Sequence, residues 1–237
     1  MSDLTYWLVM PAAGIGRRMA ESLGDARCPK QYEQLAGSRV IEHALRPFIA
    51  DRRCVGIVVA LHTDDQQFQS LPVSRDARVR VTSGGAVRAL SVLQGLNCVS
   101  ARVGSENPWV LVHDAARPML SDEDLAALVD ALPSAPHGAL LGMRVNDTVK
   151  RADEQGRSHT TVARAGLWRA ATPQAFRLRR LLEALAGASL GTITDEASAI
   201  EALGDTPQLI SCSLLNFKVT TAADLKLAAR LLTESKI

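Results

Sequence analysis

The sequence predicts an α/β fold: a mixed, mostly parallel sheet flanked by helices, with a projecting β-arm. Short apolar runs alternate with amphipathic segments along the 237 residues, a pattern typical of parallel strands joined by helices. Between about residues 144 and 168 the pattern changes to polar, threonine-rich extended segments around a turn. No linker, repeat or low-complexity stretch interrupts the sequence, so residues 1–237 are expected to form a single domain.

The first predicted strand leads into a loop of small residues. Residues 6–10 are apolar, and Pro11 is expected to end the strand because proline brings no N–H to a ladder. Mainly alanine and glycine follow up to Gly16, so a polyanion can touch the backbone N–H groups directly. Arg17 and Arg18 come next and can add positive charge on the same anion. The stretch therefore suits the phosphates of a nucleotide.

Three interpretations of this loop compete: a tight turn with solvated arginines, a dinucleotide-binding turn, and a nucleotidyltransferase loop. The dinucleotide motif G-x-G-x-x-G lacks its third glycine, because Gly14 and Gly16 are followed by Met19. A P-loop is excluded, because G-x-x-x-x-G-K-[ST] occurs nowhere in the sequence. Lys30, in a segment stiffened by the preceding proline, supplies another cation and favours the nucleotidyltransferase loop.

The next elements follow from apolar periodicity. Residues 40–49 place their apolar side chains on one helical face, and Pro47 is expected to kink or shorten that helix. Residues 55–61 are a continuous, largely β-branched run, typical of a central parallel strand. Residues 78–82 predict another strand, which leads to a pair of glycines.

A helix is expected to begin at about Val87 and to bury Leu90, Leu93 and Leu96. Residues 109–112 predict a third buried strand, which ends abruptly at the polar pair His113 and Asp114. Ligands of open parallel sheets bind at such carboxyl ends. Ser121 is expected to cap the next helix, and residues 139–143 predict one more strand.

Residues 144–151 and 159–164 predict a hairpin with turn residues at 154–157 and no clear apolar face of its own. A lone hairpin is marginally stable in water, so it needs a partner. A second copy of the chain is the economical choice, and a hairpin folded back on its own domain is the alternative.

The C-terminal elements complete the alternation. They are a helix over 178–185, a helix capped by Thr194 or Asp195 and ending at Gly204, short strands over 209–212 and 217–219, and a helix from about Thr221 that buries Leu225, Ala228, Leu231 and Leu232.

Bulk properties limit the partners and the location. The net charge is only +2 and no long basic run occurs, so neither a nucleic acid nor a membrane is an expected partner. The cysteines are scattered and form no C-x-x-C pair, which indicates idle thiols in a reducing cytosol rather than zinc or disulfides: Cys28, Cys54, Cys98 and Cys212. The N-terminal apolar run is too short for a signal peptide, so we expect a cytoplasmic protein.

Several short motifs occur together in one order. They are Pro11-Ala12-Ala13-Gly14, Arg18-Met19, Pro29-Lys30-Gln31-Tyr32, Gly84-Gly85-Ala86-Val87-Arg88 with Ser91, His113-Asp114-Ala115-Ala116-Arg117-Pro118, Asp147-Thr148-Val149-Lys150, Thr172-Pro173-Gln174, Thr194-Asp195-Glu196-Ala197-Ser198 and Lys218-Val219-Thr220. In this order and spacing the sequence resembles the 2-C-methyl-D-erythritol 4-phosphate cytidylyltransferases. The resemblance covers most of the chain, and the combination is far more specific than any single motif.

The resemblance implies a Rossmann-like fold of the nucleotide-diphospho-sugar transferase type. It implies transfer of CMP from CTP to 2-C-methyl-D-erythritol 4-phosphate, giving 4-diphosphocytidyl-2-C-methyl-D-erythritol and pyrophosphate in the non-mevalonate isoprenoid pathway. Mg²⁺ or another divalent cation is expected on the CTP phosphates, with no metal site built from the protein. The implied assembly is a homodimer formed through the β-arm.

The resemblance also assigns site residues. Catalysis falls to the cations Arg18, Lys30 and Lys218. CTP binding falls to Pro11, Ala12, Ala13, Gly14, Gly16, Arg18, Lys30, Gly85, Ala86, Ser91, Asp114 and Ala115. Acceptor binding falls to Asp114, Arg117, Thr148, Arg164, Thr172, Thr194 and Lys218, with Arg164 reaching the active site of the other subunit. The acceptor phosphate is already ionised at neutral pH and needs no base, so His113 is interpreted as structural.

Alternatives remain at particular residues. Asp114 can instead cap a loop or ligate magnesium. A relative carries an acidic residue where Ala86 stands, which leaves base selectivity unchanged only if the contact there is made by the backbone. Lone lysines and arginines are usually solvated surface charges.

Two other functions compete with the implied one. A cytidylyltransferase for another polyol phosphate, such as ribitol 5-phosphate, shares the phosphate-handling motifs and differs in the acceptor pocket. A non-catalytic nucleotide-binding regulatory protein is the alternative from another class. The presence of Arg18, Lys30, Asp114 and Lys218 together argues against it, because a sensor has no need for transition-state cations.

Overall fold

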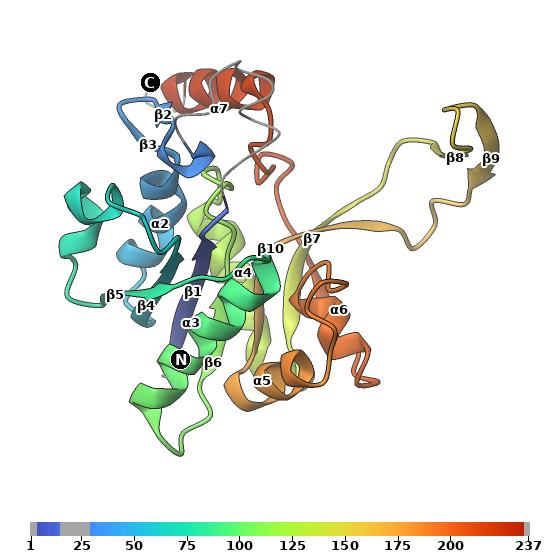
Figure 1. The fold of residues 1–237 in the computed structure, drawn as a ribbon. Coiled ribbons are helices and arrows are strands. Elements are labelled where there is room, and N and C mark those ends of the chain that lie inside the picture. The colour runs from blue at the N-terminus through green and yellow to red at the C-terminus, as the bar shows by residue number, and fades with distance from the viewer. Residues whose placement is uncertain (1–3, 15–28, 235–237) are drawn as a thin grey trace.

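The computed structural model describes residues 4–14 and 29–234 (Figure 1). Gly16, Arg17 and Arg18, which the sequence places in the phosphate loop, lie outside the described residues. Cys28 lies outside them as well.

One seven-stranded sheet organises the molecule, in the order β11-β7-β10-β6-β1-β4-β5. The strands are β1 (Tyr6–Ala12), β4 (Cys54–Leu61), β5 (Val79–Ser83), β6 (Trp109–Val112), β7 (Ala139–Arg144), β10 (Trp168–Arg177) and β11 (Gln208–Ser211). β10 runs antiparallel to both of its neighbours, and every other pairing within this described sheet is parallel. The predicted mixed, mostly parallel sheet is therefore confirmed.

Helices cover both faces of the sheet (Figure 1). They are α2 (Val40–Ala50), α3 (Arg88–Val103), α4 (Asp122–Ala131), α5 (Leu178–Ala186) and α6 (Glu196–Glu201). A further helix, α7 (Ala222–Glu234), packs instead against Leu35, Val40 and Val219 beyond the end of the sheet (Figure 1). Side chains of successive strand residues point to opposite faces, so Leu8 packs in the core with α2 and α4 while Val9 packs in the core with α3, α5 and α6. The short strands β2 (Gln34–Leu35) and β3 (Ser38–Arg39) form a separate ribbon.

The predicted end of the first strand at Pro11 is wrong, because β1 continues to Ala12. The carbonyl of Val9 accepts from the N–H of His113 at 3.1 Å, so Val9 faces β6. Pro11 lies two residues further along and has the same orientation, but the β1–β6 ladder has already ended at Val9. The missing N–H of Pro11 therefore breaks no ladder bond, and pairing with β4 continues through Ala12.

Helix positions agree with the periodicity better than helix details do. α2 passes through Pro47 and ends at Ala50, so the proline does not cut it short. The proline costs the helix one backbone bond, the one that an N–H at position 47 would donate to the carbonyl of His43, and the helix continues past this loss. α3 buries Leu96, whereas Leu90 and Leu93 are only half-buried.

The C-terminal part departs most from expectation. Asp195, one of the two predicted caps, is the N-cap of α6, but the helix ends at Glu201, before Gly204. The predicted strand over residues 217–219 is wrong, because no strand of the described sheet pairs with this segment. The N–H of Val219 donates instead to the carbonyl of Ala116 at 2.8 Å. α7 fully buries Ala228 but leaves the neighbouring leucines that were expected in the core half-buried.

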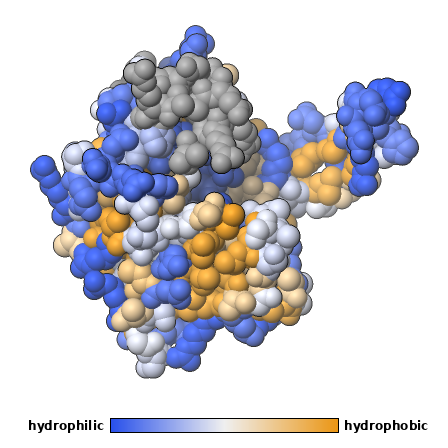
Figure 2. Space-filling model, in the orientation of Figure 1, coloured by the Kyte–Doolittle hydropathy of each residue, from blue (hydrophilic) through white to orange (hydrophobic). Residues whose placement is uncertain are grey.

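The predicted arm is present. β7 and β10 lead into a hairpin of β8 (Val149–Ala152) and β9 (Ser158–Val162), which stands clear of the sheet (Figure 1). Gly156 in its turn has a φ of +77°, a conformation that glycine adopts without strain. The end of the arm is hydrophilic, and hydrophobic residues show nearer the body (Figure 2).

Among the described residues, no helix is both long enough and apolar enough to cross a bilayer.

Close packing of α3 on β1 gives a stability prediction. A Cβ added at Gly95 would lie 2.4 Å from Cγ1 of the buried Val9, so an alanine forces the strand and helix apart. The strain outweighs the gain in helix propensity, and Gly95→Ala should lower the free energy of unfolding by about 1 kcal/mol in urea titration. Gly187→Ala is the control, because its Cβ would meet only an oxygen at 3.6 Å. Equal stability of both variants would contradict the packing argument.

Candidate active site

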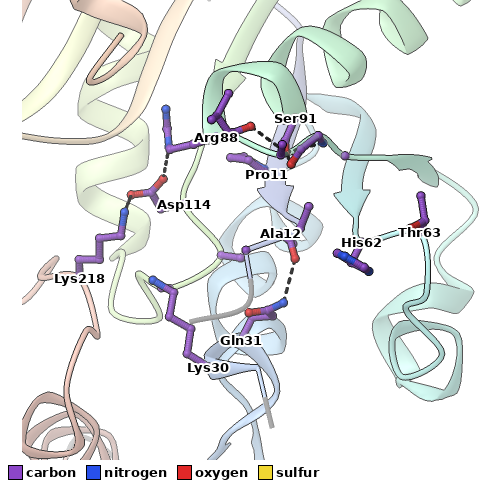
Figure 3. A pocket seen from close by; sticks show the side chains of 18 residues that line it. Pro11, Ala12, Lys30, Gln31, His62, Thr63, Arg88, Ser91, Asp114 and Lys218 are labelled. Carbon is purple, nitrogen blue, oxygen red and sulfur yellow. Dashed lines mark hydrogen bonds and ion pairs between the residues drawn. The ribbon is translucent and has the colours of Figure 1, made fainter. Parts of the chain in front are cut away.

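Four neighbouring parallel strands, β6, β1, β4 and β5, end at one cavity of about 740 Å³ (Figure 3). Open α/β sheets bind ligands at this edge, because the loops that leave the strands converge there. The lining residues are Pro11, Ala12, Ala13, Gly14, Lys30, Gln31, His62, Thr63, Gly84, Gly85, Ala86, Val87, Arg88, Ser91, Asp114, Ala115, Ala116 and Lys218. Every predicted CTP-binding residue that the structure describes is among them.

The loop after β5 is held close to the loop after β1. Ser91 is buried, and its hydroxyl accepts a hydrogen bond from the N–H of Gly85 at 3.0 Å. A Cβ at Gly84 would lie 2.4 Å from Cβ of Ala13, so only glycine fits this approach. The result is a narrow, small-residue floor in which backbone groups face the cavity.

Lys30 reaches the cavity from a short 3₁₀ turn, η1 (Lys30–Tyr32). The neighbouring Gln31 is buried and donates from Nε2 to the carbonyl of Ala12 at 2.8 Å. This bond fastens the turn to the end of β1, and it therefore fixes the position from which the side chain of Lys30 extends into the cavity (Figure 3).

Asp114 lies at the centre of a charged cluster at the end of β6. It is 6% exposed, and its Oδ2 is 2.9 Å from Nζ of Lys218 and 3.6 Å from Nε of Arg117. Its Oδ1 accepts from Nε of Arg88 at 2.8 Å. Burial alone would raise the pKa of Asp114, but Arg88 and then Lys218 hold it far below its ordinary value. The carboxylate is therefore ionised throughout the physiological pH range.

Arg88 also contacts a second carboxylate, that of Glu196. Its Nη1 and Nη2 lie 2.6 Å and 3.0 Å from the two oxygens of Glu196, which is completely buried. Burial raises the pKa of Glu196, whereas the bidentate guanidinium favours its ionised form. Both residues stand within motifs that the sequence analysis singled out, but neither was given a role. Their pairing spans 108 positions and needs the folded chain to be seen.

His113 and Thr172 fix the backbone of Asp114 through a chain of hydrogen bonds. Nε2 of His113 lies 3.2 Å from the carbonyl of Arg117, which can only accept, so Nε2 carries the proton. Nδ1 then accepts from the hydroxyl of Thr172 at 3.1 Å, and that hydroxyl oxygen accepts from the N–H of Asp114 at 3.0 Å. Burial lowers the pKa of His113 to about 4, so the ring is neutral at pH 7 and acts structurally.

The predicted acceptor residues fall into three groups. Asp114 and Lys218 line the cavity, whereas Arg117 lies against Asp114 without lining it, and its Nη1 donates to the carbonyl of Asn216 at 2.8 Å. Thr172 is buried behind Asp114 and does not line the cavity. The structure does not bring the others into the cavity of their own chain: Thr148 and Arg164 lie on the arm, and Thr194 lies exposed before α6.

His62 and Thr63 also line the cavity, and the sequence analysis did not select them. They follow β4 directly, so the rule that pointed to the residues after β6 would have found them. Gln31 was part of a recognised motif, but its hydrogen bond to β1 was not foreseen.

The described residues include no group of three or more His, Cys, Asp or Glu side chains that could hold a metal ion. Among the described lining residues Asp114 is the carboxylate, and its two oxygens lie beside the cationic side chains of Arg88 and Lys218. The positive charge of these side chains disfavours a magnesium ion bound directly to Asp114.

The burial of neutral His113 predicts a pH-dependent stability. Its pKa is about 4 in the folded chain and ordinary in the unfolded chain, so the unfolded chain binds more protons between about pH 6.5 and 4. The free energy of unfolding should therefore decrease as the pH is lowered through this window, by up to about 3 kcal/mol from this group. When the free energy of unfolding is measured by urea titration at several pH values, its dependence on pH should be weaker in His113→Gln than in the wild type. His159→Gln, on the exposed arm, should match the wild type, and an equal dependence on pH in all three would refute the assignment.

Comparison with known proteins agrees with this geometry. The family model for IspD, 2-C-methyl-D-erythritol 4-phosphate cytidylyltransferase, matches residues 6–234. The 2-C-methyl-D-erythritol 4-phosphate cytidylyltransferase of Pseudomonas savastanoi pv. phaseolicola is 47% identical over 223 residues, covering 93% of this chain and 92% of the relative. That of Ectopseudomonas mendocina is 48% identical over 222 residues, with the same coverage.

Solved structures extend the comparison to the fold. A crystal structure of 4-diphosphocytidyl-2C-methyl-D-erythritol synthase superposes with a TM-score of 0.83 at 35% identity and covers 97% of this chain and 99% of that one. The Francisella tularensis 2-C-methyl-D-erythritol 4-phosphate cytidylyltransferase superposes with a TM-score of 0.78 at 33% identity, covering 94% and 98%. The chain therefore belongs to the 2-C-methyl-D-erythritol 4-phosphate cytidylyltransferase (IspD) family.

Proposed function

We propose that this chain transfers CMP from CTP to 2-C-methyl-D-erythritol 4-phosphate, releasing pyrophosphate and forming 4-diphosphocytidyl-2-C-methyl-D-erythritol for isoprenoid precursor synthesis. The observation that carries this proposal is the cavity itself. A floor of small residues lies beside Lys30, and the ionised Asp114 and Lys218 stand at its other side. Membership of the family supports the choice of the erythritol phosphate over ribitol 5-phosphate.

In the reaction an oxygen of the acceptor phosphate attacks the α-phosphorus of CTP, and pyrophosphate leaves. The enzyme must hold two polyanions in line and neutralise the charge that grows in the transition state. Lys30 and Lys218 supply fixed positive charge from two sides of the cavity, and Arg18 is proposed to add a third cation. The attacking phosphate is already ionised, so no general base is required, consistent with the neutral, buried His113.

The two substrates are proposed to lie on different parts of the cavity. Cytosine and ribose fit the small-residue floor around Ala13 and Gly85, where backbone N–H and C=O groups provide directed contacts. The polyol hydroxyls can donate to the carboxylate of Asp114, and its phosphate can contact Lys218 or Arg117. Thr172 then contributes by holding Asp114 rather than by touching the acceptor.

A divalent cation is proposed to arrive with CTP, bound to its phosphates, where it would offset their charge. We propose that no protein carboxylate is needed as a ligand of this complex, because the positive charge of Arg88 and Lys218 beside Asp114 disfavours a metal ion bound directly to that carboxylate. The substrates are charged and water-soluble, which supports a cytoplasmic location.

We infer a homodimer in which each arm completes the neighbouring site. Arg164 is exposed on the arm, does not line the cavity of its own chain, and donates to the carbonyl of Asn146 within the arm. The hairpin pairs only with itself in the described chain and buries little of its surface. A two-fold partner would cover the arm and bring a guanidinium to the acceptor phosphate.

Turnover tests the proposed reaction. With CTP and Mg²⁺, pyrophosphate release should be at least about tenfold faster with 2-C-methyl-D-erythritol 4-phosphate than with ribitol 5-phosphate or with another nucleoside triphosphate. Chelation of the divalent cation should stop the reaction, and added Mg²⁺ should restore it. Equal or faster turnover of the ribitol ester would overturn the substrate assignment.

Mixing two inactive variants tests the shared site. Lys30→Ala should lower kcat by about 10², and Arg164→Ala should raise the KM for the acceptor more than the KM for CTP. In an equal mixture half of the dimers are hybrids, each with one intact site, so activity should recover to about a quarter of the wild type. A control mixture combines Arg164→Ala with Lys226→Ala instead of Lys30→Ala, because Lys226 lies on the exposed face of α7. A lack of recovery despite subunit exchange seen by mass spectrometry, or a monomer, would rule out the shared site.

A further inference from the structure

Glu196 is a completely buried carboxylate at the border of the active site that the proposed reaction does not use. It is the first residue of α6 and does not line the cavity. Burying a charge is costly unless the charge is paired, and the bidentate contact with Arg88 provides that pairing. A stabilising core does not need such a pair, since apolar residues of the same volume often serve as well. Its place beside Asp114 suggests a purpose in the site.

Arg88 is divided between two carboxylates in one fixed geometry. Its two terminal nitrogens contact Glu196, and only its Nε reaches Asp114, at 2.8 Å. A guanidinium is a rigid planar fork, so a fork engaged by Glu196 cannot at the same time clamp Asp114 through two nitrogens. Arg88 thus fixes one oxygen of Asp114 without covering the whole carboxylate.

This division leaves acceptor capacity on Asp114. A carboxylate has about four lone-pair positions, and the 2.8 Å contact with Arg88 and the 2.9 Å contact with Lys218 occupy one on each oxygen. Glu196 also balances charge, because it and Asp114 offset two of the three cations Arg88, Arg117 and Lys218. Without Glu196 the guanidinium would be released to turn onto Asp114 or onto a substrate phosphate.

We propose that Glu196 is a positioning residue for the acceptor: by engaging the terminal nitrogens of Arg88, it holds the guanidinium so that Nε alone fixes Asp114 and the remaining lone pairs of Asp114 stay open to the hydroxyls of the polyol. This inference rests on the proposed function, in which Asp114 binds the acceptor. It assigns Glu196 no contact with either substrate, and it separates the acceptor half of the site from the CTP half.

The first test is Glu196→Gln, which keeps the shape of the side chain and removes its charge. Loss of the charged partner frees the Arg88 fork, so the KM for 2-C-methyl-D-erythritol 4-phosphate should rise about tenfold or more. The KM for CTP should change by less than about twofold, because Glu196 acts only through Arg88 on Asp114. Glu183→Gln removes an exposed carboxylate that also pairs with an arginine, and it should match the wild type.

A double variant separates positioning from folding. Glu196→Met alone leaves Arg88 without its partner and should lower the melting temperature. Arg88→Met together with Glu196→Met replaces the pair with apolar side chains and should recover much of the melting temperature, because Asp114 loses Arg88 but keeps Lys218 as a partner. The KM for the acceptor should stay raised in the double variant, because the single bond from Arg88 to Asp114 is gone.

The outcomes distinguish the inference from the function on which it rests. A wild-type protein that does not turn over the acceptor overturns both. An active wild type with an unchanged acceptor KM in Glu196→Gln overturns the positioning role alone. The role is also overturned if the double variant recovers the wild-type acceptor KM together with the melting temperature, because the pair would then serve only the fold.

Discussion

The active site depends on keeping one carboxylate, that of Asp114, ionised while it is almost completely buried. The sheet places Asp114 at the end of β6, where Arg88 and Lys218 reach it from two other segments of the chain and Arg117 reaches it from three residues further along the same loop. Its backbone is fixed independently through Thr172 on β10. The position and charge of a single side chain thus connect elements that are distant in sequence. Moving any one of these elements alone would leave a buried charge without its partner.

The parallel arrangement of β6, β1, β4 and β5 explains why the rest of the site can be built from so little. Four strand ends meet at one edge, so four short loops are enough to line a cavity of nucleotide size. The loops carry mostly alanine and glycine, and Lys30 and Lys218 also line the cavity. In the proposed reaction the backbone groups of these loops would contact the nucleotide. Selectivity for the base would then depend on loop geometry, which the bond from Gly85 to Ser91 maintains.

Local pattern predicted most of the strands and helices, because buried strands and amphipathic helices leave a direct mark on the sequence, whereas the candidate site residues came mainly from the family resemblance. What it missed depends on neighbours. Pro11 stays in its strand because the adjacent β6 has already ended, and residues 217–219 form no strand because no partner lies beside them. The Arg88–Glu196 pair joins two motifs 108 positions apart, a relation that periodicity does not contain. Thr172 was assigned to acceptor binding, but its hydroxyl accepts a hydrogen bond from the backbone N–H of Asp114.

One strand joins the arm to the active site. β10 begins at Trp168, at the base of the arm, and passes Thr172 before it pairs with β6 from Gln174 onward. Whatever restrains the arm therefore also restrains the segment that holds Asp114. Part of the conformational entropy that the site loses on binding its acceptor would already be lost when the arm is docked. In the proposed dimer, subunit association and acceptor affinity would therefore be thermodynamically linked, even if no atom of the partner touched the substrate.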